Sequence, residues 1–419
     1  MSYEEAKRLD DTYVMHTFGR APVEFVGGHG MYLTDDKGTD YLDFLAGISV
    51  NCLGYQNARL DAAIAEQAGK LLHVSNYFQI EHRGEVARLL SQIANAGDGE
   101  ARDASPDEPQ AWRTFFGNSG AEANECAIKL ARLWAKRGGN GGCDIVCLNK
   151  SFHGRTMETI AATMQGWAQD PFKPLPGGFV AVDANDVEAL EAVFAARGKG
   201  ICAVMLEPVQ GESGVHPMSA EFMAAVRRLC DEAGALMICD EVQCGLFRTG
   251  MPLGFQNYDV TPDVFTLAKS VAGGIPMGAC VAKAEVSEAF RAGDHGSTFG
   301  GGPLASAAAE CVLTELVSGD APEGKPGHGY ADHVREVGSY LASKLAALPH
   351  VMEVRGFGLM LGAELEEGLP DAHELVNKAL AAGAVINATG PTTLRLLPPL
   401  ICTRADVDAL FDILAGVLA

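Results

Sequence analysis

The chain has 419 residues, 47% apolar and 21% charged, which is typical of a globular enzyme with two or three domains. Its net charge of −22 disfavours nucleic acids and anionic membranes as partners, because both are bound through basic patches. Residues 1–16 lack a signal-peptide pattern, no run is long enough to span a membrane, and the 11 cysteines lack zinc-site spacing. We therefore expect a cytoplasmic protein with reduced core cysteines and no metal site.

The N-terminal part reads as short strands and turns. Residues 23–55 predict short strands, with a hairpin around Lys37-Gly38 in "MYLTDDKGTDYLDF". Further along, the acidic stretch 96–110 predicts a surface loop, for which the sequence indicates no role.

Between residues 111 and 310, apolar runs alternate with amphipathic stretches, a pattern that predicts βαβ units around a parallel sheet. The expected strands lie at 113–116, 144–149, 201–209, 235–243 and 263–269. Helices are expected at about 121–137, where Ser119 and Glu122 form a capping-box pair, and at about 219–232. The sequence thus predicts a large α/β domain.

The C-terminal part predicts a mixture of helices and strands. Residues 318–329 predict a hinge loop, followed by a long helix, strands at 351–364, a helix at 371–382 and apolar strand-like segments to residue 400. We expect both chain ends to form a smaller α+β domain, with residues 1–55 joining it, 56–315 forming the large domain and 316–419 completing the small one.

Polar residues cluster just past the carboxyl end of each predicted strand. In open parallel sheets these ends meet at one edge, where ligands bind. The residues concerned are Ser119, Phe152, His153, Arg155, Glu207, Asp240, Gln243 and Lys269. Five consecutive units carrying such residues favour one active site over coincidence.

Lys269 ends an apolar run, "DVFTLAK", and a Gly-Gly pair follows soon after. It could be a core-edge lysine whose stem packs while its ammonium reaches water. It could also be a desolvated amine that is kept neutral and nucleophilic for Schiff-base formation. This stretch alone favours the first interpretation, so the other motifs must decide.

The other motifs have both ordinary and functional interpretations. "FFGNSGAEANE" could be an ordinary capped helix or a helix N-terminus that binds phosphate. Asp240 could cap a turn or pair with a protonated ring nitrogen, while "SFHGRT" offers a packed or stacking Phe152 and a solvated or carboxylate-clamping Arg155. Taken with a Schiff-base lysine, the functional interpretations describe one cofactor, pyridoxal 5′-phosphate (PLP). We find no convincing G-x-G-x-x-G nucleotide motif.

Several long motifs carry a family resemblance over nearly the whole chain, among them "YLDFLAGISV", "FFGNSGAEANECAIKLAR", "EPVQGESGV", "DEVQCGLFRTG", "LAKSVAGGIPMGA" and "HGSTFGGGPLASAAA". The chain resembles the class III, fold-type I PLP-dependent aminotransferases, and within that class the members that act on N2-acetylornithine. The resemblance implies an α/β fold with a mainly parallel, seven-stranded-type sheet in the large domain. It also implies a homodimer with shared active sites.

The resemblance implies a role for each cofactor-site residue. Lys269 would form the Schiff base and later move the substrate proton, and Asp240 would keep the pyridine nitrogen protonated. The other candidates hold the cofactor: Gly120 and Ala121 by backbone N–H groups to the phosphate, Phe152 and Val242 by sandwiching the ring, Gln243 by bonding its phenolic oxygen, and Thr298 with Ser297 by reaching the neighbouring subunit's phosphate.

The resemblance also implies how two substrates share the site. Arg155 would clamp the donor's α-carboxylate, and Arg395 would take that of 2-oxoglutarate or glutamate. Glu212 would pair with Arg395 while an ω-amino donor is bound; the ordinary alternative is two surface charges worth little. Glu207 is a further candidate substrate-binding residue. Ile48, where ornithine-specific relatives carry tyrosine, cannot hydrogen-bond an ammonium and so favours an acylated nitrogen.

One departure and several alternatives remain. The family usually has Gly-His-x-His-Pro where this chain has "LGYQNARL" at 53–60, which leaves contacts near Tyr55 open. Other donors, such as succinylornithine, succinyldiaminopimelate, ornithine or 4-aminobutyrate, fit nearly the same residues, and an aminomutase is a further rival. A non-catalytic binding protein on the same fold, or a nucleotide-dependent oxidoreductase, would each lack a use for Lys269.

Overall fold

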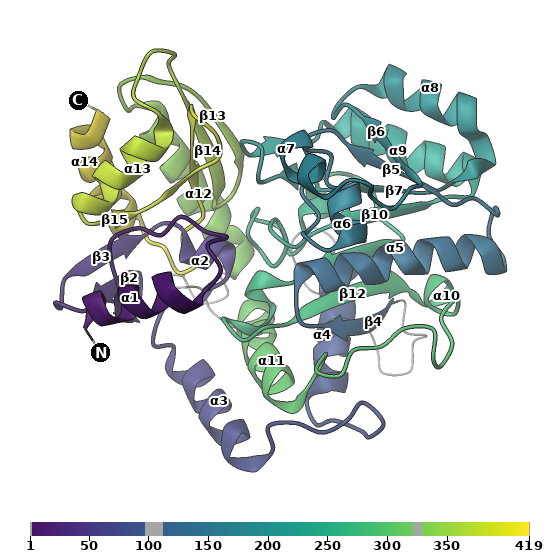
Figure 1. Ribbon diagram of the computed structural model, residues 1–419, viewed down its shortest axis with the longest axis horizontal. Helices are drawn as coiled ribbons and strands as arrows, with labels where there is room; N and C mark the ends of the chain where they lie inside the picture. The colour runs from purple at the N-terminus through teal and green to yellow at the C-terminus, as the bar shows by residue number, and fades with distance from the viewer. Residues whose placement is uncertain (1, 97–111, 320, 322–328, 419) are drawn as a thin grey trace.

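The computed structural model describes residues 2–96, 112–319, 321 and 329–418. Figure 1 shows two lobes: elements from both chain ends form one, and the middle of the chain forms the other. The predicted acidic loop at 96–110 lies outside the described residues except for Ala96, and so does most of the predicted hinge at 318–329. No helix within the described ranges is long and apolar enough to cross a membrane.

The larger lobe is built on a seven-stranded sheet with strand order β4-β12-β11-β10-β7-β5-β6. Pairing is parallel from β11 through to β6, and β12 is antiparallel to both of its neighbours. The strands are β4 (Trp112–Gly117), β5 (Asp144–Leu148), β6 (Phe179–Val182), β7 (Ile201–Leu206), β10 (Leu236–Asp240), β11 (Val264–Leu267) and β12 (Gly278–Lys283). The predicted mainly parallel α/β sheet is confirmed.

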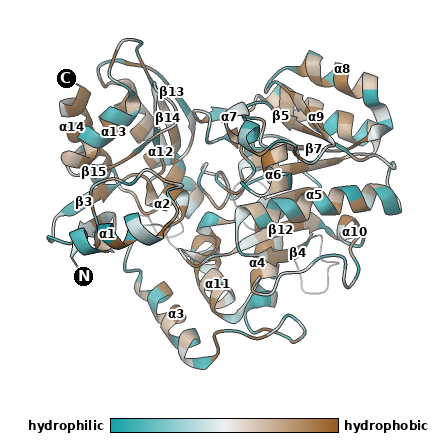
Figure 2. Ribbon diagram, in the orientation of Figure 1, coloured by the Kyte–Doolittle hydropathy of each residue, from teal (hydrophilic) through white to brown (hydrophobic). Residues whose placement is uncertain are grey.

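Helices cover this sheet, and its central strands are buried on both faces. Every residue of β7 is buried, as the continuous apolar run in its sequence requires, and Figure 2 shows apolar residues gathered in these strands. The helices of this lobe are α3 (Ala58–Lys70), α4 (Arg83–Ala94), α5 (Gly120–Arg137), α6 (Met157–Ala162), α7 (Gly166–Gln169), α8 (Val187–Arg197), α9 (Ala220–Ala233), α10 (Ala284–Ser287) and α11 (Pro303–Ser318).

Short elements connect the strands to the loops around the sheet edge. A two-stranded sheet pairs β8 (Val209–Gln210) with β9 (His216–Pro217). Four 3₁₀ turns are described: η1 (Asp170–Phe172), η2 (Gly198–Gly200), η3 (Gly254–Asn257) and η4 (Lys269–Ala272). One of them, η4, begins at the lysine singled out by the sequence.

The N-terminal segment forms a small sheet with a strand from the other end of the chain. After α1 (Tyr3–Tyr13), strands β1 (Phe25–His29), β2 (Tyr32–Asp35) and β3 (Asp40–Asp43) pair in order. The predicted hairpin lies between β2 and β3, where Asp35 Oδ1 accepts hydrogen bonds from the backbone of Lys37 and Thr39. Strand β15 (Ala384–Val385) then pairs parallel to β3. This pairing supports the proposed division at 1–55, 56–315 and 316–419, whose boundaries stay a prediction.

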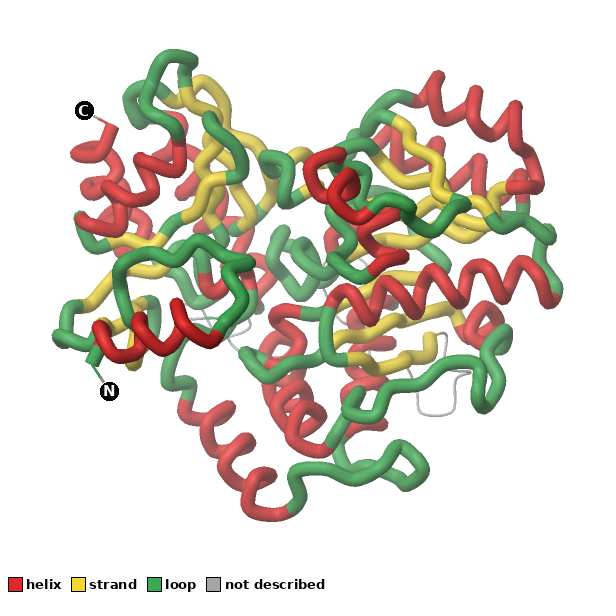
Figure 3. The backbone as a smooth tube through the Cα atoms, in the orientation of Figure 1, coloured by secondary structure: helices red, strands yellow, loops and turns green. Residues whose placement is uncertain are grey.

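The C-terminal segment adds a second sheet and three helices, which Figure 3 shows beside the N-terminal elements. The sheet has the order β13-β14-β17-β16. Its members and the helices that follow the long α12 (Tyr330–Ala346) are β13 (Val351–Phe357), β14 (Met360–Leu365), α13 (Ala372–Ala381), β16 (Asn387–Ala388), β17 (Thr393–Leu396) and α14 (Arg404–Leu418). The short α2 (Ala46–Ser49) links the two lobes through left-handed residues.

Gly278 opens β12 against the turn that precedes α5. A Cβ at this position would lie 2.2 Å from the Ser119 carbonyl oxygen, which is backbone and cannot turn aside. We expect Gly278→Ala to lower the free energy of unfolding by about 1–3 kcal/mol, as overpacking does, measured by urea unfolding. Gly416→Ala in α14 is the control, because nothing lies within 4 Å of its Cβ position. Equal unfolding midpoints for the two variants would contradict this expectation.

Candidate active site

A cavity of about 470 Å³ opens at the carboxyl ends of the central strands. Residues from the loops after β4, β5, β7, β10 and β11 line it, as the sequence predicted for one shared edge. The candidate residues that line it are Gly120, Ala121, Phe152, Arg155, Glu207, Glu212, Asp240, Val242, Gln243 and Lys269. Residues more than 140 positions apart in the sequence, such as Ala121 and Lys269, therefore share one cavity.

One end of the cavity is the N-terminus of α5. Ser119 is the N-cap, and its hydroxyl accepts a hydrogen bond from the Glu122 backbone N–H at 3.2 Å. The Glu122 carboxylate turns to the backbone N–H of Asn118, so only half of the predicted capping box forms. A Cβ on Gly120 would lie 2.8 Å from Val242, so glycine is needed for this close approach. The free N–H groups and the helix dipole suit a phosphate.

Lys269 lies at the other side of the cavity, two residues after β11 ends. Its φ of 49° is left-handed, a strained conformation for a residue with a side chain. Burial lowers the pKa of its ammonium below the usual range, although the Glu212 carboxylate acts in the opposite direction. A lowered pKa increases the share of neutral amine, which is the nucleophilic form.

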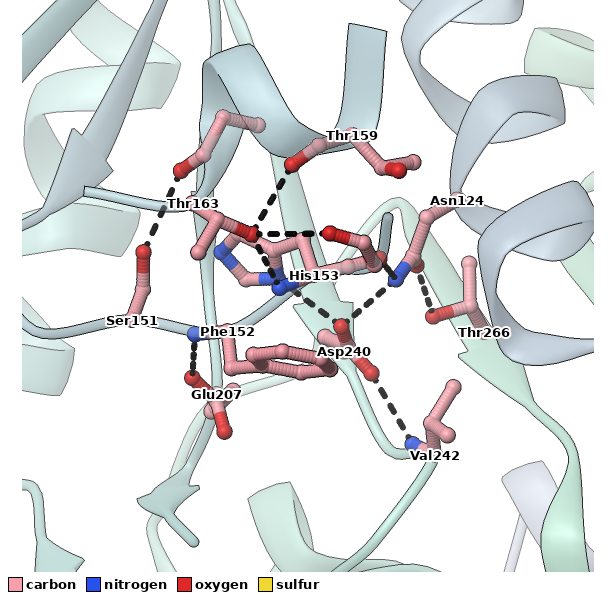
Figure 4. A network of polar contacts seen from close by, with 12 residues as sticks. Asn124, Ser151, Phe152, His153, Thr159, Thr163, Glu207, Asp240, Val242 and Thr266 are labelled. Atoms are coloured by element: carbon pink, nitrogen blue, oxygen red, sulfur yellow. Dashed lines mark hydrogen bonds and ion pairs between the residues drawn. The ribbon is translucent and has the colours of Figure 1, made fainter. Parts of the chain in front are cut away.

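Asp240 ends β10 and is held by three hydrogen bonds (Figure 4). Its Oδ2 lies 2.7 Å from Asn124 Nδ2 and 2.8 Å from His153 Nδ1, and its Oδ1 accepts from the Val242 backbone N–H at 3.0 Å. Asn124 is itself fixed by Thr266, whose hydroxyl donates to Asn124 Oδ1 at 2.6 Å. With Oδ2 occupied twice and Oδ1 only once, Oδ1 keeps acceptor capacity for a further donor in the cavity.

His153 is fully enclosed behind Asp240. Burial alone would lower the pKa of its imidazole, but the hydrogen bond to Asp240 and the charge of that carboxylate outweigh burial and raise it. Its Nε2 is buried and has no hydrogen-bond partner within the described part of the chain. The imidazole therefore serves Asp240 through Nδ1, and its charged form stabilises the ionised carboxylate.

Glu207 connects two loops of the cavity wall. One oxygen accepts from the Phe152 backbone N–H at 2.8 Å and the other from the Gly211 backbone N–H at 3.2 Å. Burial raises the pKa of Glu207 to about 7, against the attraction of His153. Both oxygens are thus engaged by the backbone, and Figure 4 shows the carboxylate beside the Phe152 loop. This geometry orients Phe152. Glu207 also lines the cavity, and its suggested contact with substrate stays a prediction.

Glu212 and Arg395 form an ion pair at the cavity wall. Arg395 Nη1 lies 2.7 Å from Glu212 Oε1 and 3.1 Å from Gln243 Oε1, and Gln243 Nε2 donates to the same Glu212 oxygen. On the other side of the guanidinium, Arg395 Nε and Nη2 both donate hydrogen bonds to Asn387 Oδ1. Arg395 is only 1% exposed and lies behind Glu212, which does line the cavity. Arg395 holds the pKa of Glu212 below its usual range despite the opposing effect of burial.

Besides Arg395, three candidate residues lie outside this cavity. Ile48 is in α2, is 37% exposed and does not line it. Ser297 and Thr298 line a neighbouring cavity of about 920 Å³ instead. Ser297 still adjoins the α5 end of the first cavity, because its Oγ accepts from Asn118 Nδ2 at 3.1 Å.

Sequence reasoning assigned no role to Asn124, Thr266 or His153, which together position Asp240. For two of these residues, Asn124 and Thr266, the sequence pattern does contain a signal. Asn124 interrupts the apolar face of α5, and Thr266 interrupts the apolar run of β11. Buried polar residues in apolar patterns need partners, so both pointed to a shared acceptor.

Comparisons with known proteins identify the family to which the chain belongs. Residues 15–418 match the family described as Aminotransferase class-III, and the chain belongs to this family. The family depends on PLP. The chain is 42% identical over 425 residues to the acetylornithine aminotransferase of Methanocaldococcus jannaschii, covering 100% of this chain and 98% of that protein. It is 43% identical over 415 residues to that of Gloeobacter violaceus, with 98% and 96% covered.

The solved structures that are similar to this chain also include aminotransferases. The ornithine aminotransferase of Toxoplasma gondii ME49 has a TM-score of 0.88 at 29% identity, with 100% of this chain and 95% of that chain covered. The N-acetylornithine aminotransferase of Stenotrophomonas maltophilia K279a has a TM-score of 0.78 at 34% identity, with 98% and 97% covered. The predicted fold type and cofactor are therefore confirmed.

The residues present fit PLP. The N–H groups at the start of α5 suit its phosphate. Gly120 lacks the Cβ that would lie 2.8 Å from Val242 at this end of the cavity. Asp240 Oδ1 has acceptor capacity for a ring N–H, and the lowered pKa of Lys269 suits an amine that meets an aldehyde.

Proposed function

We propose that this protein transfers the ω-amino group of N2-acetylornithine to 2-oxoglutarate, giving N-acetylglutamate 5-semialdehyde and glutamate in arginine biosynthesis. The observation that carries the proposal is the Glu212–Arg395 pair at the wall of a cavity that already contains the PLP-binding groups. Full-length identity of about 42% to proteins named acetylornithine aminotransferase supports this choice of donor.

The cofactor-binding roles follow from the cavity wall. When bound, PLP supplies an aldehyde and an electron-withdrawing ring that stabilises negative charge beside the amine-bearing carbon. Gly120 and Ala121 would hold its phosphate, and Phe152 and Val242 would pack on its ring. Asp240 keeps a proton on the ring nitrogen. Lys269, as a neutral amine, would hold the proton that the amine-bearing carbon of the substrate gives up during the reaction.

Gln243 is proposed to bond the phenolic oxygen, as the family resemblance implies. Its side chain now lies between Arg395 and Glu212, which makes it part of the switch network as well. Ser297 and Thr298 are proposed to reach the phosphate of the neighbouring subunit.

The two substrates are proposed to use the two ends of the cavity. Arg155 at the cavity lining binds the donor's carboxylate, and the distal amine then reaches the Lys269 end. Glu212 neutralises Arg395 during this half of the reaction. When 2-oxoglutarate enters, its α-carboxylate takes the place of Glu212 on Arg395. Ile48 offers no hydrogen bond to a free ammonium, which favours the acylated donor; Glu207 acts through the Phe152 loop.

Glu212→Gln tests the switch. The amide no longer neutralises Arg395, so glutamate binds more easily and the ω-amino donor meets an uncompensated cation. We expect the ratio of kcat/KM for N2-acetylornithine to that for glutamate to fall about 10- to 100-fold. This is below the 3–5 kcal/mol of a broken, fully buried pair, because Glu212 keeps 29% exposure.

A matched control exists in the C-terminal sheet. Glu364 pairs with Arg355 at 2.5 Å and has 28% side-chain exposure, but neither residue lines the cavity. Glu364→Gln is expected to leave the ratio unchanged. A ratio in Glu212→Gln within twofold of the wild-type value would remove the proposed switch.

A panel of amine donors with 2-oxoglutarate tests the function itself. The panel contains N2-acetylornithine, N2-succinylornithine, ornithine and 4-aminobutyrate, and kcat/KM is measured for each with purified holoenzyme. We expect N2-acetylornithine to exceed ornithine. Ornithine belongs in the panel because the solved structures that match include ornithine aminotransferases. Equal or greater activity with ornithine would overturn the proposal, and protein that takes up no PLP would favour a binding role.

A homodimer is also proposed. The cavity that contains Ser297 and Thr298 is lined by Tyr77 as well, and Tyr77 and Phe299 are 95% and 65% exposed in the single chain. Aromatic side chains exposed next to candidate phosphate-binding residues suit a second copy of this chain. Light scattering should give twice the chain mass of 44.1 kDa; a monomer with full activity would contradict the shared site.

A cytoplasmic location stays a prediction. It is supported by the cysteines, nine of which are buried and none of which is joined to another cysteine in the described residues. Such thiols suit a reducing compartment.

A further inference from the structure

Arg155 lies between the cavity and an exposed aromatic residue that the sequence motifs did not include. Its guanidinium carbon is 4.8 Å from the centre of the Trp167 ring and 5.5 Å from that of Phe152. Within the described ranges of the chain, no carboxylate pairs with Arg155, although it is a cation at the lining of the site. The described contacts of its charged group are thus with two ring faces.

Trp167 is fixed to the same loop that carries Arg155. The indole Nε1 donates to Gln165 Oε1 at 2.7 Å, and Gln165 Nε2 donates to the Ser151 carbonyl at 2.9 Å. The Lys150 backbone N–H also bonds the Met164 carbonyl at 2.9 Å. The indole is therefore held by hydrogen bonds although 62% of the residue is exposed. Such exposure gives little stabilisation by burial, so packing alone does not account for its placement.

We propose that Trp167 is a positioning residue that sets specificity for donors with a carboxylate distal to the reacting amine. A cation–π contact stabilises the guanidinium through its charge and uses none of its N–H donors. Arg155 is thereby held in place with its hydrogen bonds available for a bidentate carboxylate. Fixing the side chain in advance lowers the entropic cost of binding. This inference rests on the proposed function, because it takes the donor's carboxylate to bind at Arg155.

The test compares two donors in holoenzyme carrying Trp167→Leu or Trp167→Phe. N2-acetylornithine has the carboxylate, and n-pentylamine has a similar primary alkyl amine without it. For N2-acetylornithine we expect kcat/KM to fall about 2- to 30-fold in Trp167→Leu, which is the range of a cation–π contact. We expect recovery to within about twofold in Trp167→Phe, which keeps a ring face. The n-pentylamine value should stay unchanged in both variants.

Phe172 provides a matched control. It is a neighbouring exposed aromatic residue, 54% exposed, in the adjoining η1 turn, and Arg155 does not contact it. Phe172→Leu should leave both donors unchanged. Inhibition by glutarate, a dicarboxylate without amine or keto group, gives a second measurement. Its inhibition constant should rise in Trp167→Leu and stay constant in Phe172→Leu.

The outcomes separate this inference from the proposed function. An equal fall for both donors in Trp167→Leu would show a structural role and overturn the inference, as would no change for N2-acetylornithine. If the wild type prefers ornithine or 4-aminobutyrate, the proposed function fails. The Trp167 comparison is then made with that donor, which also carries a carboxylate.

Discussion

Replacing Lys269 by alanine is expected to lower kcat by about 10⁴-fold, the upper end of what a positioned proton-transfer group contributes. The other titratable groups that line the cavity already have partners: Glu207 is held by two backbone N–H groups, Glu212 by Arg395, and Asp240 by Asn124 and by Nδ1 of the buried His153. The variant should still take up PLP, since the α5 N-terminus and Asp240 are unchanged. Turnover and cofactor content are measured on the same sample.

Lys283→Ala is the control for this expectation. Lys283 is another partly buried lysine of the same sheet, 2.8 Å from Asp263, and it does not line the cavity. Its loss should leave kcat within about threefold while costing some stability, as the loss of a partly buried pair does. Turnover of Lys269→Ala at a comparable rate would refute the role of Lys269.

The sequence could predict where the site would form, because strand ends in a parallel sheet converge whatever their distance along the chain. Lys269 and Phe152 follow apolar strands, Asp240 ends one, and all three line one cavity. The Glu212–Arg395 contact could not come from spacing, since 182 intervening residues separate the partners. It came from the family resemblance, and the structure contains the ion pair.

Periodicity predicted less of the fold where no βαβ unit was present. Strand β12 pairs antiparallel to β11, so it is not part of a βαβ unit, and the helical pattern that marks such units does not precede it. Strand β6 and helices α1, α3, α4 and α14 were also absent from the expected elements, and none of the residues of α1 is buried. The left-handed backbone at Lys269 depends on tertiary packing and has no local glycine signal.

Asp240→Asn is expected to lower kcat on the order of 10²- to 10³-fold, as does the loss of a preorganised electrostatic partner. An amide carries no negative charge, so it cannot keep the ring nitrogen of PLP protonated. The amide must also meet two donors, Asn124 Nδ2 and His153 Nδ1, that now share one carboxylate oxygen. Asp263→Asn is the control: Asp263 is also buried in this sheet and bonds Arg227, but lies outside the cavity.

The same substitution has a second consequence, at His153. In the wild type, Asp240 overcomes the effect of burial and raises the pKa of His153. Because His153 has a higher pKa in the folded protein than in the unfolded chain, its protonation stabilises the fold. This stabilisation is complete at pH values below the pKa of the unfolded chain, about 6.5, and is lost as the pH rises through the pKa of the folded protein. In Asp240→Asn burial prevails, so the pKa of His153 should fall below 6.5 and the variant should be destabilised most at low pH. Urea unfolding of both proteins between pH 5 and 8 measures the difference. A destabilisation that is constant over this range, together with activity within threefold of wild type, would mean that the carboxylate neither charges His153 nor serves the cofactor.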